Sequence, residues 1–295
     1  MTGILLLDKS PGISSQQAVR RVQRILGAQR AGHGGTLDPQ AEGLLPILLG
    51  SATRLSRFLL DGDKGYTAEA LLGRVTDTQD DTGKTLAQFP VDVTYEQLSD
   101  VTARFVGDIE QLPPMYSALS IGGQRLYKLA RKGMEVERSP RPITVHAIDI
   151  IHYEAARVLF SVQCSKGTYI RTLIHDIGQM LGCGACMTKL RRTRVGDFSV
   201  EDAYTVDALE DAVANGRTTE AIKPPESLFG ALPVVSPPAF YAKLLRDGQS
   251  VLQHKLNSAI PASGMARLYC EGAFFGFLCE SLDQDGSTLR LIWRV

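Results

Sequence analysis

Near its N-terminus the chain alternates between apolar segments that must be buried and a polar loop rich in glycine. Gly3–Leu7 is a short continuous apolar run, which is typical of a strand buried on both faces. Ala31–Gly43 is the polar loop, and Leu44–Leu49 then returns the chain to the core. A loop that polar between core segments is a candidate functional site, and it contains His33 and Asp38.

The length of the chain and its proline distribution predict two domains. With 295 residues, 44% of them hydrophobic and 22% charged, the chain has an ordinary globular composition and can bury one large core and a smaller one. Prolines gather between Lys223 and Pro238, as they do in linkers. We therefore expect a main domain over residues 1–230 and a small module over residues 231–295.

Hydrophobic periodicity and capping residues predict the elements of the main domain. Ser14 with Gln17, and Thr94 with Gln97, have the spacing of a capping box and predict two helix starts. Further helices are expected at Arg125–Lys132, which is basic, and from Ile170 to Leu181, and strands at Tyr66–Leu72, Ile143–Ile150, Val158–Cys164 and Met187–Val195.

The small module is expected to be rich in β-structure. Arg267–Cys270 and Ala273–Cys279 flank Glu271 and Gly272, which resemble a hairpin turn, and Leu289–Val295 is a candidate final strand. With the helices and strands above, these segments predict an α+β protein with a mixed, mostly antiparallel sheet flanked by helices.

The net charge neither indicates nor excludes a nucleic-acid partner, because 32 basic and 32 acidic residues leave it at zero. Basic residues nevertheless gather in Arg20–Arg30, Arg125–Arg141 and Lys189–Arg194. Such clusters can present a basic face to phosphates, but on charge alone we interpret them as solvated helix faces.

Cysteine content and the N-terminus favour a cytoplasmic protein without a metal site. The five cysteines are an odd number, and the first residues lack a signal-peptide core, so reduced thiols are expected. Cys183 and Cys186 have CxxC spacing, but a single pair without a second pair is a weak indication of zinc. No apolar run has the roughly 18 residues of a membrane span.

Taken one by one, the polar candidates have ordinary alternatives. Asp38 precedes Pro39, a pair that often starts a helix with aspartate as the N-cap. His33 could simply make a hydrogen bond within its loop. Arg171 could lie on the surface of its helix or cap the helix. Tyr66 and Tyr169 have the alternative of core aromatics with a satisfied hydroxyl group.

Six ordered motifs shift this balance. The longest is the GHGGTLDPQAEGLLP stretch over residues 32–46. The others are KSPGISS (9–15), YTA (66–68), PPMYSA (113–118), CSKGTYIR (164–171) and LRRT (190–193). Together they resemble the motifs of the TruB family of tRNA pseudouridine synthases, whose catalytic motif the stretch over residues 32–46 resembles. The resemblance covers most of residues 1–200.

This resemblance implies an isomerase that needs no cofactor or metal. The family reaction breaks the bond between uracil N1 and ribose C1′, turns the base within the site, and rejoins it through C5. Glycoside hydrolysis normally uses two carboxylates, whereas the matched motif supplies one, Asp38. By resemblance Asp38 is the nucleophile, which attacks either C1′ or C6 of the nucleotide.

The resemblance also assigns substrate-binding roles to six further residues. Arg171 matches the arginine that pairs with the catalytic aspartate, and we expect a bidentate pair. Tyr66 matches the tyrosine that stacks on the flipped base. The remaining expectations are that His33 occupies or braces the gap left in the RNA loop, that Tyr169 and Leu190 line the uracil pocket, and that Lys9 supports the pocket or a phosphate.

By the same resemblance, residues of about 115–145 form an inserted thumb-like segment that closes on the RNA backbone, and residues 231–295 form a PUA-like RNA-binding module. Two departures from the family pattern stand out. Ser120 replaces a usual lysine, which puts an RNA or structural contact in doubt, and Ser10 intervenes before Pro11 and could shift Lys9.

The expected substrate is the T stem-loop of tRNA, with the target uridine at position 55. We expect a cytoplasmic monomer without a membrane segment or an obligatory protein partner. The alternatives are a non-enzymatic RNA-binding module, a guide-RNA-dependent synthase that works in a ribonucleoprotein, and an RNA glycosidase that releases free uracil.

Overall fold

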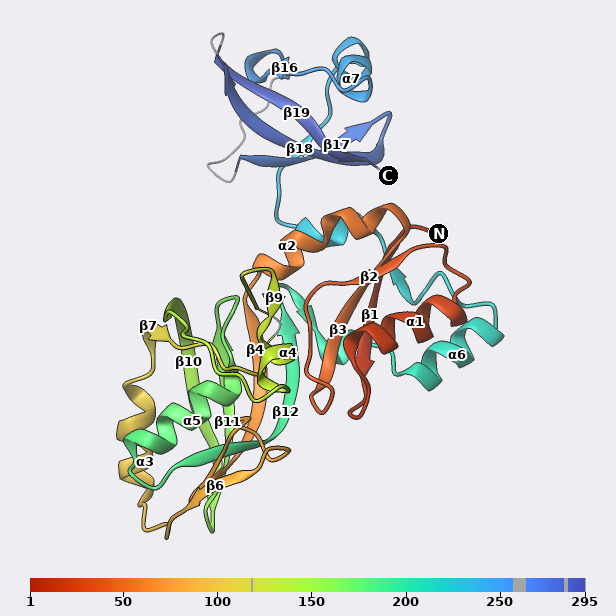
Figure 1. Cartoon of the computed structure of the whole chain (residues 1–295). Helices are drawn as coiled ribbons and strands as arrows, with labels where there is room; N and C mark the ends of the chain where they lie inside the picture. Colours follow the sequence, from red (N-terminus) through yellow and green to blue (C-terminus); the bar gives the residue numbers. More distant parts are fainter. Residues whose placement is uncertain (118, 257–263, 284–285, 295) are drawn as a thin grey trace.

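The computed structural model describes residues 1–117, 119–256, 264–283 and 286–294, and these contain two main sheets and two small two-stranded ones (Figure 1). The larger has 10 strands and the smaller has 5. Helices flank both sheets, and antiparallel pairing predominates, which confirms the predicted α+β fold. No helix in the described residues is long and apolar enough to cross a membrane.

The large sheet consists of two parts that meet at a parallel pair. Its main path runs β14-β1-β3-β12-β4-β11-β10-β7, with β2 added to β3 and β13 to β12. Only β3 and β12 run parallel within this sheet as described, through Glu42 opposite Arg191 and Gly43 opposite Arg192. The strands are β1 (Gly3–Lys9), β2 (Ala31–His33), β3 (Glu42–Leu49), β4 (Lys64–Leu72), β7 (Gly107–Gln111), β10 (Arg141–Glu154), β11 (Arg157–Cys164), β12 (Ala185–Val195), β13 (Phe198–Ser199) and β14 (Ile222–Lys223).

Helices begin where the capping residues predict. Ser14 and Gln17 form a capping box at the start of α1 (Ser15–Ile25), and Thr94 and Gln97 form another at α3 (Tyr95–Ala103). The other elements around the large sheet are η1 (Gly50–Leu55), α2 (Ser56–Asp61), β5 (Arg74–Thr76), β6 (Thr85–Gln88), α5 (Ile170–Met180), η2 (Val200–Asp202), α6 (Val206–Ala214) and η3 (Pro225–Phe229).

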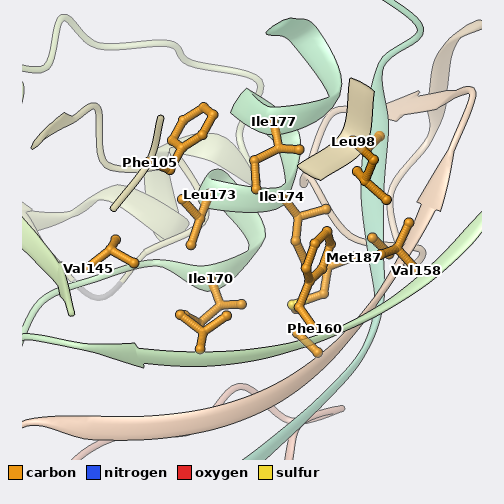
Figure 2. Close-up of a cluster of buried hydrophobic side chains, with 14 of the residues drawn as sticks. Leu98, Phe105, Val145, Val158, Phe160, Ile170, Leu173, Ile174, Ile177 and Met187 are labelled. Carbon is orange, nitrogen blue, oxygen red and sulfur yellow. The ribbon is translucent and has the colours of Figure 1, made fainter. Parts of the chain in front are cut away.

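The core under α5 holds the N-terminus of that helix against the centre of the sheet. Figure 2 shows Ile170, Leu173, Ile174 and Ile177 on one face of the helix, packed toward Phe160 and its neighbours on the sheet. Burial of each such side chain contributes roughly 1.5–3 kcal/mol. Arg171, the residue after Ile170, therefore lies near the centre of the sheet on a firmly packed helix.

The predicted thumb-like segment contains a shorter helix than expected. The expected helix at Arg125–Lys132 is confined to α4 (Leu126–Ala130), because Arg125 belongs to β9 (Gln124–Arg125). That strand pairs with β8 (Ser120–Ile121), and both glycines of the turn between them have positive φ. Residue 118 of the predicted PPMYSA motif lies outside the described residues.

The small sheet forms the C-terminal part of the chain. Its order is β15-β17-β18-β19-β16, and the hairpin expected at Glu271 and Gly272 is confirmed by φ values of 54° and 79°. The elements are β15 (Val234–Val235), α7 (Ala239–Arg246), β16 (Val251–Leu252), η4 (Gln253–Leu256), β17 (Met265–Cys270), β18 (Ala273–Asp283) and β19 (Gly286–Arg294). Val295, the end of the predicted last strand, lies outside the described residues.

An aromatic cluster joins the small sheet to the segment after β3. Trp293 donates its indole N–H to the carbonyl oxygen of Ser51 at 3.0 Å. Phe229 makes edge-to-face contacts, with centroids 4.9 Å apart, to Phe58 of α2 on one side and Phe277 of β18 on the other. The C-terminal sheet thus rests on α2 and η1 (Figure 1).

Gly43 makes the parallel junction possible. Its φ is +98°, and a Cβ atom there would lie 2.3 Å from the carbonyl oxygen of Arg192. We expect Gly43→Ala to lower the free energy of unfolding by about 3 kcal/mol, because the left-handed backbone costs roughly 1–2 kcal/mol and overpacking adds to it. Chemical denaturation measures this. Gly230→Ala is the control, since its φ is −54° and nothing lies within 4 Å of the added atom.

Candidate active site

A cavity of about 310 Å³ opens where the two parts of the large sheet meet. Its size is near the lower end of the range typical of small-molecule sites. Six chain segments surround it: the loop before β3, the end of α2, β4, the segment between β7 and β8, β12, and the loop that leads into α5 together with the first residues of that helix. Its lining residues are Gly35, Thr36, Leu37, Asp38, Leu60, Lys64, Tyr66, Ser117, Ser165, Gly167, Thr168, Tyr169, Ile170, Arg171, Met187, Leu190 and Arg192.

Asp38 lies in this lining and does not start a helix. The chain makes a single turn at Pro39, in which the amide of Ala41 donates to the carbonyl oxygen of Asp38 at 3.1 Å, and it then enters β3. The helix-start interpretation of the Asp-Pro pair is therefore wrong. The Asp38 side chain is 42% exposed, so the carboxylate faces the cavity while its backbone is held.

Buried side chains from β1 and α1 hold the loop that carries Asp38. The Ser15 hydroxyl group donates to the carbonyl oxygen of Leu37 at 3.0 Å and accepts from its amide at 2.8 Å. The Lys9 ammonium group donates to the carbonyl oxygens of Ser10, Ile13 and Pro39 at 2.9, 2.9 and 3.2 Å. The backbone of Asp38 is thus fixed on both sides.

Lys9 is fully buried, and this decides between the two roles expected for it. A side chain with no exposed surface that donates to three carbonyl groups supports the loop and does not face a phosphate. Burial lowers the pKa of Lys9 to about 8, although the nearby Asp38 and Glu42 carboxylates act in the opposite direction.

Arg192 holds the same loop from the side of β12, and it was not among the predicted site residues. Its side chain is 1% exposed and donates to the carbonyl oxygens of Leu44 at 2.7 Å, Gly35 at 3.2 Å and Thr36 at 3.4 Å. It also shares a side-chain hydrogen bond with Tyr66. Desolvation lowers the pKa of Arg192.

The basic run Lys189–Arg194 is therefore not a solvated helix face. It lies on β12, where alternate side chains point to opposite faces of the sheet. Arg192 is buried beside the cavity, whereas Arg191 makes a two-nitrogen contact to Asp8 at 2.7 and 3.1 Å. The LRRT motif includes Arg192, but nothing in the local sequence indicates that Arg192 is buried and Arg191 is not.

Arg171 and Asp38 come together as predicted, although their geometry differs from the expected bidentate pair. Arg171 Nη2 lies 3.2 Å from Asp38 Oδ2 and also donates to the carbonyl oxygen of Tyr116 at 2.7 Å. Its Nη1 is directed to Asp80 Oδ2 at 3.5 Å. The Arg171 side chain is 7% exposed, so its guanidinium group bridges two carboxylates in a largely dry environment.

Asp80, the second carboxylate, was also missed from the sequence. Its Oδ1 accepts hydrogen bonds from Thr78 Oγ1 at 2.7 Å, Thr82 Oγ1 at 2.5 Å and the Thr82 amide at 3.0 Å. These donors leave Oδ2 free to face Arg171. The acidic run Asp77–Asp81 was visible in the sequence, but only the packing of its loop against α5 selects Asp80.

Tyr66, Tyr169 and Leu190 all line the cavity, as predicted. Burial raises the pKa of Tyr66 and of Tyr169, so both phenols are protonated at neutral pH. The backbone of Tyr169 is fixed by Gln111, which accepts from its amide at 2.8 Å and donates to its carbonyl group at 3.1 Å. Aromatic faces and an apolar side chain therefore surround Asp38.

His33, like Lys9, is a predicted residue that lies apart from the cavity lining. It ends β2, and its Nδ1 accepts a hydrogen bond from the amide of Gly35 at 3.4 Å. Burial and the nearby Arg192 lower the pKa of His33, so the imidazole is neutral at pH 7. It lies two residues from the lining and has no direct contact with Asp38.

The lining as a whole suits a nucleophilic carboxylate acting on a flat, partly apolar group. Asp38 is the only carboxylate among the described lining residues, and Arg171 lies 3.2 Å from it. No group of three or more histidine, cysteine, aspartate or glutamate side chains in the described parts of the chain could hold a metal ion.

The chain is similar to known proteins over most of its length. Residues 23–170 match the profile of the TruB family pseudouridylate synthase N-terminal domain, and residues 171–230 match that of the tRNA pseudouridylate synthase B C-terminal domain. The chain is 46% identical to a tRNA pseudouridine synthase B of Aromatoleum aromaticum over 274 residues, which cover 93% of this chain and 87% of the relative. It is 44% identical to the protein of that name from Chromohalobacter salexigens over 292 residues, with 98% and 94% covered.

A solved structure extends the similarity to the whole fold. A chain in the structure of an H/ACA RNP bound to a substrate RNA containing 2′-deoxyuridine superposes with a TM-score of 0.75 and 27% identity. The match covers 99% of this chain and 84% of that chain.

The role of Arg192 in holding the loop can be tested by hydrogen exchange. We expect Arg192→Met to speed amide exchange at Gly34 and Leu37 at least about tenfold, because about 1.4 kcal/mol of local stability gives that factor. Arg194→Met, at an exposed position of the same strand, is the control and is expected to leave the exchange unchanged. Equal exchange in the two variants would contradict the proposed support of the loop.

Proposed function

Because the chain belongs to the TruB family of pseudouridylate synthases and converts uridine to pseudouridine in tRNA, we propose that its target lies in the T loop and that Asp38 is its nucleophile. The observation that carries this proposal is the Asp38–Arg171 pair in a cavity lined by Tyr66, Tyr169 and Leu190. The target is position 55, as the resemblance of the motifs implies.

The carboxylates favour isomerisation over hydrolysis. A glycosidase normally needs a second carboxylate that activates water. The second carboxylate here, Asp80, is turned toward Arg171 and does not line the cavity. Because the described lining residues include no second carboxylate to activate water, we expect the released base to be retained and rejoined, without free uracil among the products.

Asp38 requires a negative charge to attack C1′ or C6 of the nucleotide. Arg171 supplies the opposite charge at 3.2 Å and leaves Asp38 Oδ1 available for the attack. The three hydrogen bonds to Asp80 fix the far side of Arg171. The direction of the nucleophile is therefore set before the substrate arrives.

The target uridine has to leave its stack to enter a cavity of this size. We place Tyr66 against the face of the flipped base, where stacking contributes roughly 1–3 kcal/mol. Leu190 and Tyr169 would line the remaining sides. His33 lies outside the lining, two residues before Gly35 of that lining, and we propose that it occupies or braces the gap left in the RNA loop.

The other parts of the chain would contact the rest of the tRNA. We propose that the thumb-like segment of about 115–145 closes on the RNA backbone, and that residues 231–295 act as a PUA-like RNA-binding module. The C-terminal family profile ends at residue 230, which supports a division of the chain there. RNA recognition of this kind depends on shape more than on base identity.

The protein is proposed to work as a monomer on free tRNA. One structural neighbour belongs to an H/ACA RNP, so a guide-RNA-dependent mode is the specific alternative. The curated relatives at 44–46% identity are tRNA pseudouridine synthases, which favours direct action. Modification of a purified tRNA transcript by the protein alone would separate these two modes.

The nucleophile is tested by tritium release from a tRNA transcript labelled at uridine C5. We expect the wild type to release tritium and Asp38→Asn to lose this activity by more than about a thousandfold, because an amide is a poor nucleophile. Binding of the transcript, measured by filter retention, is expected to change less than about twofold, since Asp38 is one group in a large interface.

Asp100→Asn, at an exposed position of α3, is the matched control and is expected to keep full activity. Carbodiimide mapping of the product is expected to place pseudouridine at position 55. Activity of Asp38→Asn near that of the wild type, or free uracil in place of pseudouridine, would overturn the proposal.

The bridging role of Arg171 gives a second prediction. We expect Arg171→Lys to reduce the single-turnover rate about 100-fold, because one ammonium group cannot face both Asp38 and Asp80 as the guanidinium group does. Arg157→Lys, whose ion pair with Glu69 is 57% exposed on the arginine side, is the control. A rate within twofold of the wild type would show that the bridge is dispensable.

A further inference from the structure

Lys64 is a buried lysine in the wall of the cavity, and none of the roles assigned above uses it. It is the first residue of β4, and its side chain lies on the same face of the strand as that of Tyr66. Lys64 is 7% exposed, and both residues line the cavity. A lysine beside the surface on which the base is proposed to stack can act on the base itself.

The contacts of Lys64 leave part of its ammonium group unused. The Nζ atom donates to the carbonyl oxygen of Leu60 at 2.6 Å and to that of Gly62. Both carbonyl groups lie at the end of α2, next to the mouth of the cavity. An ammonium group has three N–H donors, so these contacts account for two of them.

No carboxylate in the described residues lies within 4 Å of Lys64. The charged or titratable groups that act on it are Arg192 of β12, Cys164 of β11, Asp61 at the end of α2, and Asp63 just after that helix. Asp61 is already paired with Lys166 at 2.7 Å, and Asp63 with His146 at 3.2 Å. Lys64 therefore has no ion-pair partner among the described residues, and the more distant Asp61 and Asp63 offset only part of the effect of its burial.

A buried charge without a partner destabilises a folded protein. Here burial, with a further contribution from Arg192, lowers the pKa of Lys64 to about 8. A cation kept at such a cost in a cavity wall is typical of a functional group. The lining contains three cations, Lys64, Arg171 and Arg192, against the single carboxylate of Asp38, so it is suited to an additional negative charge.

The reaction produces such a charge on the base. When the C1′–N1 bond breaks, its electron pair stays with uracil, and the negative charge spreads over N1, O2 and O4. The base is then joined to C1′ through C5. The proton that C5 loses is balanced by the proton that N1 gains, so no oxidant, reductant or added atom is needed.

We propose that the Lys64 ammonium group stabilises the uracil anion formed when the glycosidic bond breaks and retains the base while it turns. This inference rests on the proposed isomerisation and adds an electrostatic residue to it. Of the three cations, the terminal nitrogens of Arg171 are engaged by Asp38 and Asp80, and Arg192 is engaged by loop carbonyl groups. Lys64 makes two contacts, both to carbonyl groups, so one of its three N–H groups remains for the base.

An anionic oxygen could also belong to a phosphate of the RNA. The position of Lys64 beside Tyr66 favours the base, because the phosphates of a flipped nucleotide stay nearer the mouth than its base does. The two sources differ in their effects. Loss of a contact to the base lowers the rate at which the bound RNA reacts. Loss of a contact to a phosphate instead weakens RNA binding and reduces the salt dependence of binding.

The test compares Lys64→Met and Lys64→Arg with the wild type in single-turnover tritium release at saturating enzyme. We expect Lys64→Met to be about 100-fold slower, with the Kd for the transcript unchanged within about twofold. Lys64→Arg keeps the charge and is expected to recover the rate to within about tenfold of the wild type. Lys189→Met, an exposed lysine on the other face of the sheet, is the control.

The pH profile separates an electrostatic role from a purely structural one. The wild-type rate is expected to fall above about pH 8, because the ammonium group loses its proton and its charge. Lys64→Arg is expected to remain active to higher pH, and Lys64→Met to be slow without this fall. A fall that persists in Lys64→Arg would assign it to another group, such as Lys9, and would count against the proposal.

The remaining outcomes are also decisive. A normal single-turnover rate in Lys64→Met would overturn the inference, as would a raised Kd with a reduced salt dependence, which would identify a phosphate contact. If Lys64→Met unfolds, a Lys64→Arg protein that is folded but as slow as Asp38→Asn would overturn it. Failure of the wild type itself to release tritium would instead overturn the proposed T-loop isomerisation.

Discussion

The buried guanidinium group of Arg192 is the interaction on which the rest of the site depends. It lies where β12 runs parallel to β3, and it holds the carbonyl groups of Gly35, Thr36 and Leu44. The junction is so close that only glycine fits at residue 43. Because the loop has no regular structure of its own, these hydrogen bonds substitute for a helix or a sheet ladder in fixing Asp38.

Electrostatics at the site follow from an excess of buried positive charge. Lys9, Lys64 and Arg192 are all buried, and desolvation lowers the pKa of each. None has a carboxylate within 4 Å in the described structure, so their field acts on the cavity, where Asp38 is the only acid. Such a field suits the negatively charged base that we propose to form there, at the expense of folding stability.

The C-terminal sheet is connected to the cavity through α2. Trp293 is anchored to Ser51, and Phe229 bridges Phe58 and Phe277. The end of the same helix provides Leu60, which lines the cavity and also accepts a hydrogen bond from Lys64. A change in the position of the C-terminal sheet would therefore act on the wall of the site through a short path of packed side chains.

The sequence alone determined the strands, the capped helices and the loop that carries Asp38, because hydrophobic periodicity and capping act over a few residues. It did not reveal Asp80, Lys64 or Arg192, and it overestimated the α4 helix. A charged residue in a short segment is usually solvated, so its burial is visible only once distant strands pair. The parallel pairing of β3 with β12, and the packing of α5 on the sheet, decided which arginine faces Asp38 and which supports its loop.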